Sequence, residues 1–416
     1  MIDILREYNF WDNQKINIGF FRKSYLKNIS GYLNNKLVKV LLGQRRVGKS
    51  YIFRMLIKML MEEHNVLSRN IIYINKDIQA LDFIDSASKL DAVIKSYIKE
   101  FSPKGKIYVF LDEIQEISGW EKSVNSLSQD YTREYEIFIT GSNANLLSSE
   151  LSTYLSGRYV TINIYPYSYS EFLAFYNLGR NKDSYIKYLY KGGIPELYNL
   201  PAKELRTNYI SALKDSIILR DIIQRHNIRD VTLLNRLIDF VIDTHASLFS
   251  PNKIVNSLKS LGVKTNIETI GSYLNYMTEA FFIHESFRYD LKGKRILAGE
   301  RKYYLNDLSF KYYLNSSFDR GISRYLENAV YLHYKRNGYM IFTGKLKDKE
   351  IDFVVEKGDD KKYVQVAYLL ADENVIKREF GNLLSIKDNY EKLVVSLDDI
   401  NLGTIEGIKH VNAWEM

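Results

Sequence analysis

Cysteine is absent from the chain, and proline is scarce, with 5 among 416 residues. Without cysteine, a disulfide scaffold, a thiolate zinc site and a cysteine nucleophile are excluded. No apolar run approaches the roughly 18 residues that a membrane-spanning helix needs. The N-terminal segment, MIDILREYNFWDNQK, lacks the basic-then-apolar layout of a secretion signal. We therefore expect a cytoplasmic protein that makes no membrane contact.

Charged and aromatic residues are abundant instead. The chain has 58 Lys+Arg against 50 Asp+Glu, which gives a formal net charge of +8, and it has 34 tyrosines. A hydrophobic fraction of 46% argues against long disordered tails. At about 150 residues per domain, the length predicts two to four domains. We interpret the tyrosines as a compositional bias; stacking on nucleic acid is the alternative interpretation.

Residues 36–175 alternate short apolar strands with amphipathic helices, after a lead-in at 1–35 with one expected helix around 20–33. An order of strand, helix and strand predicts parallel pairing with crossovers, and hence an α/β sheet that is covered on both faces. One of the helices is expected at 51–64. The expected strands are 36–43, 70–75, 106–113, 135–141 and 159–164.

Three further modules are expected along the chain. Residues 176–243 place apolar side chains at helical spacing and predict a helical subdomain. Residues 244–315 have the layout of a winged helix-turn-helix, two short helices and a hairpin, with Thr265 and Glu268 at capping-box spacing before the second helix. Residues 316–416 predict a helix, a hairpin, a strand, a helix and a strand, which together form a small separate α/β unit.

The strongest motif is a glycine-rich loop that fits the pattern G-x-x-x-x-G-K-[ST] between an expected strand and an expected helix. Its backbone N–H groups and the helix N-terminus favour phosphate binding. Lys49 brings a positive charge to the β- and γ-phosphates of ATP, and Ser50 offers a hydroxyl to Mg²⁺. The predicted nucleotide-binding residues are Gly43, Gln44, Arg45, Arg46, Val47, Gly48, Lys49, Ser50 and Tyr51.

Two carboxylates, Asp112 and Glu113, follow the third expected strand. Ligands of open α/β sheets bind at the carboxyl ends of the strands, so this pair is expected to face the glycine-rich loop. Asp112 would hold the Mg²⁺ shell through water, and Glu113 would orient and deprotonate the attacking water. We therefore predict an ATPase site.

Two further positions are candidates for sensing the γ-phosphate. The fourth expected strand ends in Thr-Gly-Ser-Asn, where Asn143 or Ser142 is suited to position water or phosphate; a side-chain-capped turn is the alternative. Arg158 precedes the fifth expected strand, where a guanidinium could reach the nucleotide of a neighbouring subunit. A surface salt bridge is the alternative for Arg158.

Several segments together resemble the bacterial and archaeal AAA-type ATPases that carry a C-terminal domain of unknown function. They are GQRRVGKS, FLDEIQEISGWE, ITGSNANLLSSELSTYLSGRY, YPYSYSEFL, KGGIPELY and LRDII. The resemblance implies an ATP-binding P-loop core with Mg²⁺, a helical lid at 176–243, a winged helix and a nuclease-like unit. It implies an arginine-finger role for Arg158. Gly193 and Pro195 resemble a lid element that packs near adenine, and an ordinary helix break is the alternative.

The C-terminal unit resembles the PD-(D/E)xK nuclease core, which needs a helix carboxylate, a hairpin Asp and a Glu-x-Lys on the next strand. Glu327 and Asp352 match the first two positions. The third motif has Gln365 in place of the carboxylate and Ala367 in place of the lysine, so a metal ligand and a cation are missing. We predict that this unit does not cleave DNA with a metal.

Partner classes follow less directly from the sequence. The candidate wing at 284–302 has six cationic and three acidic residues, but the candidate recognition helix at 267–278 has no Lys or Arg. Double-stranded DNA and a protein partner therefore both remain candidates. We expect an ATPase that drives a conformational switch, and a homo-oligomer if Arg158 acts between subunits. A nucleotide-dependent signalling switch with negligible turnover and an ATP-regulated nuclease are the alternatives.

Overall fold

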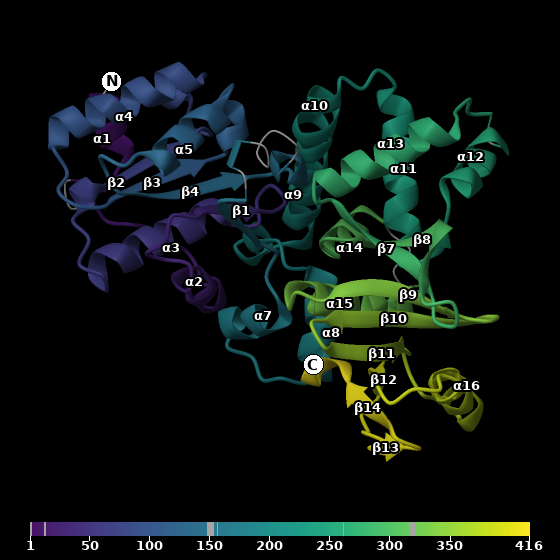
Figure 1. Cartoon of the computed structure of the whole chain (residues 1–416). Helices are drawn as coiled ribbons and strands as arrows, with labels where there is room; N and C mark the ends of the chain where they lie inside the picture. Colours follow the sequence, from purple (N-terminus) through teal and green to yellow (C-terminus); the bar gives the residue numbers. More distant parts are fainter. Residues whose placement is uncertain (1, 12–13, 148–153, 156, 261, 316–320) are drawn as a thin grey trace. The chain divides into compact units, whose positions relative to one another are not determined.

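The computed structural model describes residues 2–11, 14–147, 154–155, 157–260, 262–315 and 321–416 (Figure 1). The chain divides into two compact units, Met1–Ile164 and Tyr165–Met416. None of the helices in these described ranges is both long enough and apolar enough to cross a bilayer.

The first unit is built on a five-stranded parallel sheet, as the alternation of strands and helices predicts. The strand order is β2-β3-β4-β1-β5, so β4 lies between β1 and β3. Every residue of β1, β2 and β3 is buried, which is typical of a parallel sheet covered on both faces. The strands are β1 (Val38–Leu42), β2 (Ile71–Asn75), β3 (Ile107–Asp112), β4 (Tyr135–Gly141) and β5 (Tyr159–Asn163).

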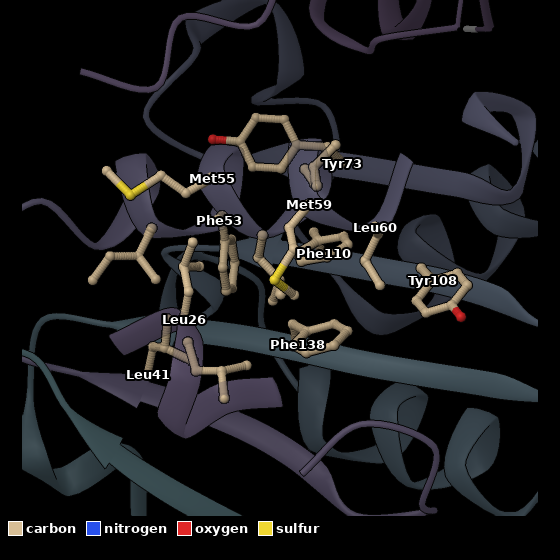
Figure 2. Packing of buried hydrophobic residues seen from close by; sticks show 14 of the residues in the cluster. Leu26, Leu41, Phe53, Met55, Met59, Leu60, Tyr73, Tyr108, Phe110 and Phe138 are labelled. Carbon is tan, nitrogen blue, oxygen red and sulfur yellow. The ribbon is translucent and has the colours of Figure 1, made fainter. Parts of the chain in front are cut away.

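Helices cover both faces of this sheet. Figure 1 shows α1 (Ile2–Tyr8), α4 (Ala87–Phe101) and α5 (Trp120–Gln129) on one face, and α2 (Lys23–Ser30) and α3 (Lys49–Glu62) on the other. Aromatic side chains form much of the core beneath α3 (Figure 2). The rings of Phe110 and Phe138 stack at 4.5 Å, and Phe53 meets Phe110 edge-on at 5.1 Å. Short 3₁₀ turns are η1 (Ser68–Asn70), η2 (Gln79–Leu81), η3 (Ile114–Glu116) and η4 (Ala144–Leu147).

The lead-in before β1 covers the open edge of the sheet. The side chain of Asn9 accepts from Tyr73 N at 2.7 Å and donates to Tyr73 O at 3.0 Å, as a neighbouring strand would. The indole of Trp11 donates to Ile71 O at 2.6 Å. An uncovered edge strand invites pairing with other chains, so these contacts protect β2. The expectation of a single helix around 20–33 is wrong: α2 is shorter, and α1 precedes it.

The second unit begins with a run of helices, most of which lie in the helical subdomain expected at 176–243. A π-helical stretch, η6 (Ile217–Ile223), joins two of them without a break and contains the segment LRDII. Pro195 begins η5 (Pro195–Tyr198), where its missing N–H costs no hydrogen bond. The helices are α7 (Tyr169–Tyr176), α8 (Lys182–Lys191), α9 (Lys203–Ser216), α10 (Gln224–His226) and α11 (Val231–Thr244).

Two helices and a hairpin follow in the predicted order. They are α12 (Pro251–Ser260), α13 (Ile267–Glu279), β7 (Ile283–Asp290) and β8 (Arg295–Leu305). The predicted capping box of α13 is wrong. Asn266 caps the helix by accepting from Thr269 N at 2.8 Å, while the Thr265 hydroxyl is buried without a partner in the part of the chain that the structure describes. Asn is as good a cap as Thr, and the helix therefore begins one residue later.

The remaining strands join the hairpin in one mixed sheet of nine strands, in the order β13-β14-β12-β11-β10-β9-β7-β8-β6. Strand β7 pairs with β9 in parallel, so backbone pairing crosses the module boundary expected at 315/316. The domain limits themselves stay a prediction. The elements are β6 (Leu248–Phe249), α14 (Ser309–Leu314), α15 (Ile322–Arg336), β9 (Met340–Leu346), β10 (Lys349–Lys357), β11 (Asp360–Val366), α16 (Glu373–Leu384), β12 (Glu391–Ser396), β13 (Thr404–Ile405), β14 (Ile408–Asn412) and η8 (Ala413–Glu415).

Candidate nucleotide site

The glycine-rich loop joins the end of β1 to the start of α3. Gly48 has φ +98° at the helix N-cap, a left-handed conformation that side chains rarely adopt. A Cβ on Gly43 would lie 2.2 Å from Ile164 O, so only glycine allows the chain to pass this close. Both glycines of the motif are therefore required by the backbone path.

Other residues of the loop divide between buried and exposed positions. Gln44 and Arg45 are buried, whereas Arg46 is exposed and left-handed at φ 68°. A residue outside the motif holds the backbone of Val47: the buried Arg22 donates a hydrogen bond from Nη1 to Val47 O at 3.1 Å. Tyr51 is 42% exposed, with the Arg54 guanidinium 5.0 Å from its ring centre. Arg22 is a part of the site that the motif alone does not reveal.

The strand order brings three chain segments to one edge of the sheet. The glycine-rich loop follows β1, Ser142 and Asn143 follow β4, and Glu113 follows β3. Because β4 separates β1 from β3, the Ser-Asn pair lies between the loop and the two carboxylates. The structure therefore gathers the predicted loop, sensor and acidic residues at one edge.

Asp112 is fully buried and its carboxylate is held by three hydroxyls. Thr140 donates to Oδ1 at 2.5 Å and Tyr73 donates to Oδ2 at 2.8 Å. The Ser50 hydroxyl is the third partner. Burial and the charge of Glu113 raise the pKa of Asp112 above its usual range, and the hydroxyls oppose this shift. The link from Ser50 to Asp112 joins the two residues that the sequence predicts near Mg²⁺.

Glu113 has the left-handed backbone φ of 54°, which is uncommon for a residue other than glycine. Strain of this kind often marks functional sites. Oε1 of Glu113 lies 3.1 Å from Nζ of Lys49, and Oε2 accepts from Gln115 at 2.5 Å. Burial raises the pKa of Glu113, but the charges of Lys49 and Arg45 outweigh burial and hold it below its ordinary value. Glu113 is therefore ionised at neutral pH.

Thr140 couples the two carboxylate residues. Its hydroxyl donates to Asp112 and accepts from the backbone N–H of Glu113 at 2.8 Å. Both neighbours and Thr140 itself are buried, so loss of this hydroxyl would leave polar groups unpaired. Sequence spacing could not predict the contacts of Thr140 and Tyr73 with Asp112, because these contacts cross between strands.

Two buried amide atoms at the same edge have no hydrogen-bond partner among the described residues. One is Nδ2 of Asn143, and the other is Oε1 of Gln115. The Oδ1 atom of Asn143 accepts from Asn145 N at 2.8 Å, so the turn expected as an alternative does form. The free Nδ2 donor keeps Asn143 available for a phosphate or water oxygen. The sensor role stays a prediction.

Arg158 lies at the far end of β1 from the loop. Its carbonyl accepts from Val38 N at 3.0 Å, and its Nε donates to Leu155 O at 3.1 Å. Five residues of strand, about 16 Å, separate Val38 from the loop that follows Leu42. The structure does not bring Arg158 to the nucleotide site of its own chain.

Gly193 and Pro195 belong to the second unit, where local packing accounts for them. Gly193 N donates to the buried Asp307 at 2.6 Å, and Gly193 O accepts from Tyr167 N at 2.7 Å. These contacts fix the turn between α8 and η5. The contact of Gly193 and Pro195 with adenine stays a prediction.

The first unit offers a donor set that fits Mg-ATP. Lys49 Nζ bonds only to oxygens of the chain, namely Glu113 and the carbonyls of Gly43 and Gln44 at 3.0 and 3.3 Å, among the contacts that the structure gives. These are contacts that phosphate oxygens can replace. Ser50 and Asp112 supply the hard oxygens that Mg²⁺ prefers. In the described ranges, no cluster of three His, Asp or Glu side chains could hold a metal by itself.

A second constellation lies in the C-terminal unit, where Glu327 of α15 and Asp352 of β10 come together as predicted. An ammonium group lies between them. Nζ of Lys302, on β8, is 2.8 Å from Glu327, 2.7 Å from Glu350 and 3.6 Å from Asp352. Lys302 is buried, and the charge of Glu327 opposes burial and raises its pKa. A lysine ammonium therefore lies among the three carboxylates.

The remaining positions of the motif contact the backbone or the hydrophobic core. Oδ2 of Asp352 accepts from Val366 N at 2.8 Å. Gln365 is buried beside Asp352, and Ala367 is part of the hydrophobic core under α16. Neither Gln365 nor Ala367 contributes a charge. Lys302 and Glu350 also belong to this cluster of charged side chains, and the sequence motif did not identify them. Lys302 lies outside the motif, on strand β8 of the preceding hairpin.

Comparison with known proteins places the chain in a family. The AAA domain matches residues 35–173. A protein of Haemophilus influenzae, named only as uncharacterized, is 36% identical over 396 residues, which cover 93% of this chain and 96% of that protein. The chain belongs to the same family as this Haemophilus influenzae protein, and it carries an AAA domain at residues 35–173. A second match, Domain of unknown function (DUF8612), covers residues 182–321 of this AAA-type chain.

Other similarities are more distant. An uncharacterized protein of Methanocaldococcus jannaschii is 31% identical over 383 residues, 88% of this chain and 81% of that protein. Among solved structures, the Walker-type ATPase paby2304 of Pyrococcus abyssi is 16% identical, with a TM-score of 0.46 over 71% of this chain and 96% of that chain. Cdc6p of Pyrobaculum aerophilum is 12% identical, with a TM-score of 0.33 over 70% and 92%.

Proposed function

We propose that this AAA-type protein hydrolyses ATP with Mg²⁺ and uses the reaction to switch contacts of its second unit with DNA or a protein partner. One observation carries the proposal. The ion pair of Lys49 with Glu113 lies beside the hydrogen bond of Ser50 with Asp112. Together these four residues supply a phosphate-binding cation, a hydroxyl, a carboxylate and a base at one edge of the sheet.

Lys49 and Arg45 bind the phosphates in this mechanism. Both side chains are buried in or beside the loop, and both lower the pKa of Glu113. When the β- and γ-phosphates of ATP enter, Lys49 exchanges the carboxylate of Glu113 and two loop carbonyls for phosphate oxygens. Backbone N–H groups at the start of α3, whose cap is Gly48, complete the cradle.

Release from Lys49 makes Glu113 available as the general base. While Glu113 is paired with Lys49 its pKa is below the ordinary value, so it is ionised when ATP arrives. It then accepts the proton of the attacking water as the water adds to the γ-phosphorus and ADP leaves. Gln115 keeps the carboxylate oriented through Oε2. Nδ2 of Asn143 donates to a γ-phosphate or water oxygen, since it has no partner among the described residues.

Ser50 and Asp112 would hold the magnesium shell. When bound, Mg²⁺ neutralises charge that develops on the β- and γ-phosphates. Both oxygens of Asp112 already accept hydrogen bonds from Thr140 and Tyr73, so Asp112 acts on the shell through Ser50 and water. The three hydroxyls orient the carboxylate before the substrate arrives.

Arg158 is proposed to act between subunits. Within its own chain, Arg158 lies beside the start of β1, and the loop follows the end of that strand, about 16 Å away. Arg158 would therefore reach only the nucleotide of a neighbouring copy. A guanidinium there neutralises charge in the transition state. This role requires a homo-oligomer.

The output surface is proposed to be α13 and the β7–β8 hairpin. Half of the hairpin's cations are committed to ion pairs: Arg288 with Glu300, Arg301 with Glu285, and Lys302 with its three carboxylates. The tip retains Lys292, Lys294 and Arg295. This distribution leaves a small basic tip for DNA phosphates, and α13 brings no positive charge. A protein partner is the second candidate.

A switch with negligible turnover is the alternative function. The contacts of Glu113 with Lys49 and Gln115 favour it, because they restrain the base until ATP binds. Two experiments separate these candidate functions. One measures phosphate release with and without double-stranded DNA, and the other measures the mass of the protein assembly in the presence of ATP. We expect turnover, its stimulation by the partner and assembly in ATP. Flat, slow turnover would favour the switch, and DNA nicking would favour a nuclease.

A further inference from the structure

The second unit contains a cavity of about 390 Å³ that the nucleotide site does not use. Its walls come from α7, α8, α9 and α14. Aromatic rings and cations dominate the lining, and no residue that lines it in the described ranges is acidic. Its cations are Lys187, Lys191 and Arg206.

Lys191 is a half-buried cation whose ammonium contacts aromatic rings. It has no ion pair or hydrogen bond among the described residues, and its ammonium lies 4.9 Å from the ring centre of Tyr176 and 5.4 Å from that of Tyr198. Cation–π contacts of this kind stabilise an ammonium less than a carboxylate does when the site is partly buried. An anion that enters the cavity would therefore form an ion pair with the ammonium of Lys191, which otherwise contacts only aromatic rings among the described residues.

A second polar group in the lining also lacks a partner. The hydroxyl of Tyr176 is buried and makes no hydrogen bond within the described ranges. Arg206 is anchored by Leu200 O and Pro201 O at 2.8 and 2.9 Å, so its charge is fixed beside the cavity. Tyr190 and Tyr312 stack with their ring planes 2° apart and present a flat aromatic wall.

We propose that this cavity binds one nucleotide unit, with the base against the tyrosine wall and the phosphate at Lys191 and Arg206. A flat ring with an anionic group matches aromatic walls combined with uncompensated cations. The volume lies within the range of small-ligand sites. The unit can come from a free mononucleotide or from an unpaired nucleotide of a single strand, which share this chemistry.

Binding is tested on full-length protein that carries Lys49→Ala, which removes phosphate binding at the glycine-rich loop. Adenosine monophosphate and a thymidylate oligonucleotide are titrated by calorimetry. We expect at least one to bind, with adenosine and inorganic phosphate at least about tenfold weaker, because each supplies half of the recognition. Tighter binding of the oligonucleotide identifies a strand as the source, and tighter binding of the mononucleotide identifies a free nucleotide.

Two variants connect binding to the cavity. Lys191→Met should weaken it by about tenfold or more, whereas Lys182→Met, on the same helix but paired with Asp399, should leave it unchanged. Tyr176→Phe should weaken it several-fold without lowering the melting temperature, because the hydroxyl has no partner to lose. The proposal would be overturned if neither probe binds, or if Lys191→Met leaves their affinity unchanged. Phosphotyrosine, titrated in the same way, tests for a different aromatic anion, and binding of phosphotyrosine without binding of either probe would also overturn the proposal.

Proton uptake gives a readout that a merely structural role would not produce. Burial, and then the charge of Arg206, lower the pKa of Lys191 to about 8, so a bound phosphate at that pH should draw a proton onto it. The calorimetric heat should then depend on the buffer, and Lys191→Arg should abolish the dependence. Burial raises the pKa values of Tyr176, Tyr198 and Tyr313, so these neighbours do not titrate there.

Discussion

The ammonium of Lys49 and the carboxylate of Glu113 lie 3.1 Å apart, and both side chains are buried. The predicted phosphate-binding cation and the predicted base therefore form an ion pair with each other. An incoming phosphate must compete with Glu113 for Lys49, and success in that competition frees the base. Binding and activation of the base are thus one event in the proposed mechanism.

Glu113→Gln should separate these two effects. Removing the carboxylate removes the competitor for Lys49, so ATP should bind about tenfold more tightly, while hydrolysis falls by at least about a hundredfold because the base is lost. Calorimetry measures the first and phosphate release the second. Glu116→Gln is the matched control and should change neither, because Glu116 is an exposed acid on the 3₁₀ turn that follows Glu113. Equal turnover by wild type and Glu113→Gln would refute the base assignment.

Thr140→Val should lower kcat about tenfold to a hundredfold with a smaller change in KM. The substitution keeps the shape of the side chain but removes the hydroxyl that bonds Asp112 and the backbone of Glu113. Thr140→Ser restores the hydroxyl and should recover most of the activity. A loss in Thr140→Ser as large as that in Thr140→Val would show that packing, and not the hydrogen bonds, explains the effect.

The ATPase activity of Arg158→Ala should be partly restored when this variant is mixed with Lys49→Ala. Alone, Arg158→Ala and Lys49→Ala should each have little ATPase activity. A mixture should regain a measurable fraction, because a subunit with intact Lys49 can then meet an intact Arg158 on its neighbour. Phosphate release over a range of protein concentrations checks this. Full activity of Arg158→Ala by itself, or no recovery on mixing, counts against a role between subunits.

Lys302→Met should destabilise the second unit more at high pH than at low pH. The buried ammonium balances Glu327, Glu350 and Asp352, and its removal should cost about 3–5 kcal/mol near neutral pH. Burial, and then the charge of Glu327, already raise the pKa of Asp352, and loss of Lys302 should raise it further.

The sign of this pH dependence follows from proton binding. Carboxylates with raised folded-state pKa values take up protons on folding, so the variant should regain stability as the pH falls from about 8 toward the unfolded-state values near 4. Thermal unfolding of both proteins across this range measures the difference. Lys292→Met at the hairpin tip, which has no ion pair among the described residues, serves as the control. A destabilisation that does not change with pH would exclude the charge explanation.

The wild-type protein should not cleave double-stranded DNA with Mg²⁺ or Mn²⁺. Lys302 fills the place of the metal, and Gln365 and Ala367 lack the charges that the reaction needs. A nicking assay with both metals tests this. Metal-dependent cleavage that Asp352→Ala abolishes would overturn the prediction.

The sequence alone determined the local parts of the site. Residues 43–50 form the loop wherever a strand precedes and a helix follows, because the glycine conformations and the helix N-terminus are short-range properties. In the same way, Asp112 and Glu113 had to emerge at a strand end, since five apolar residues bury β3. All five strands of the parallel sheet were predicted for the same reason, from apolar runs bounded by turns.

Only the tertiary structure decided which side chains meet. The hydroxyls of Tyr73 and Thr140 reach Asp112 because β2 and β4 flank β3, and hydrophobic periodicity does not encode strand order. Lys302 reaches Asp352 because β7 pairs with β9 across an expected boundary. These contacts depend on long-range pairing, whose specificity is distributed over the whole core. The chemistry of the loop could thus be read locally, whereas its pre-organisation and the lysine-filled carboxylate cluster could not.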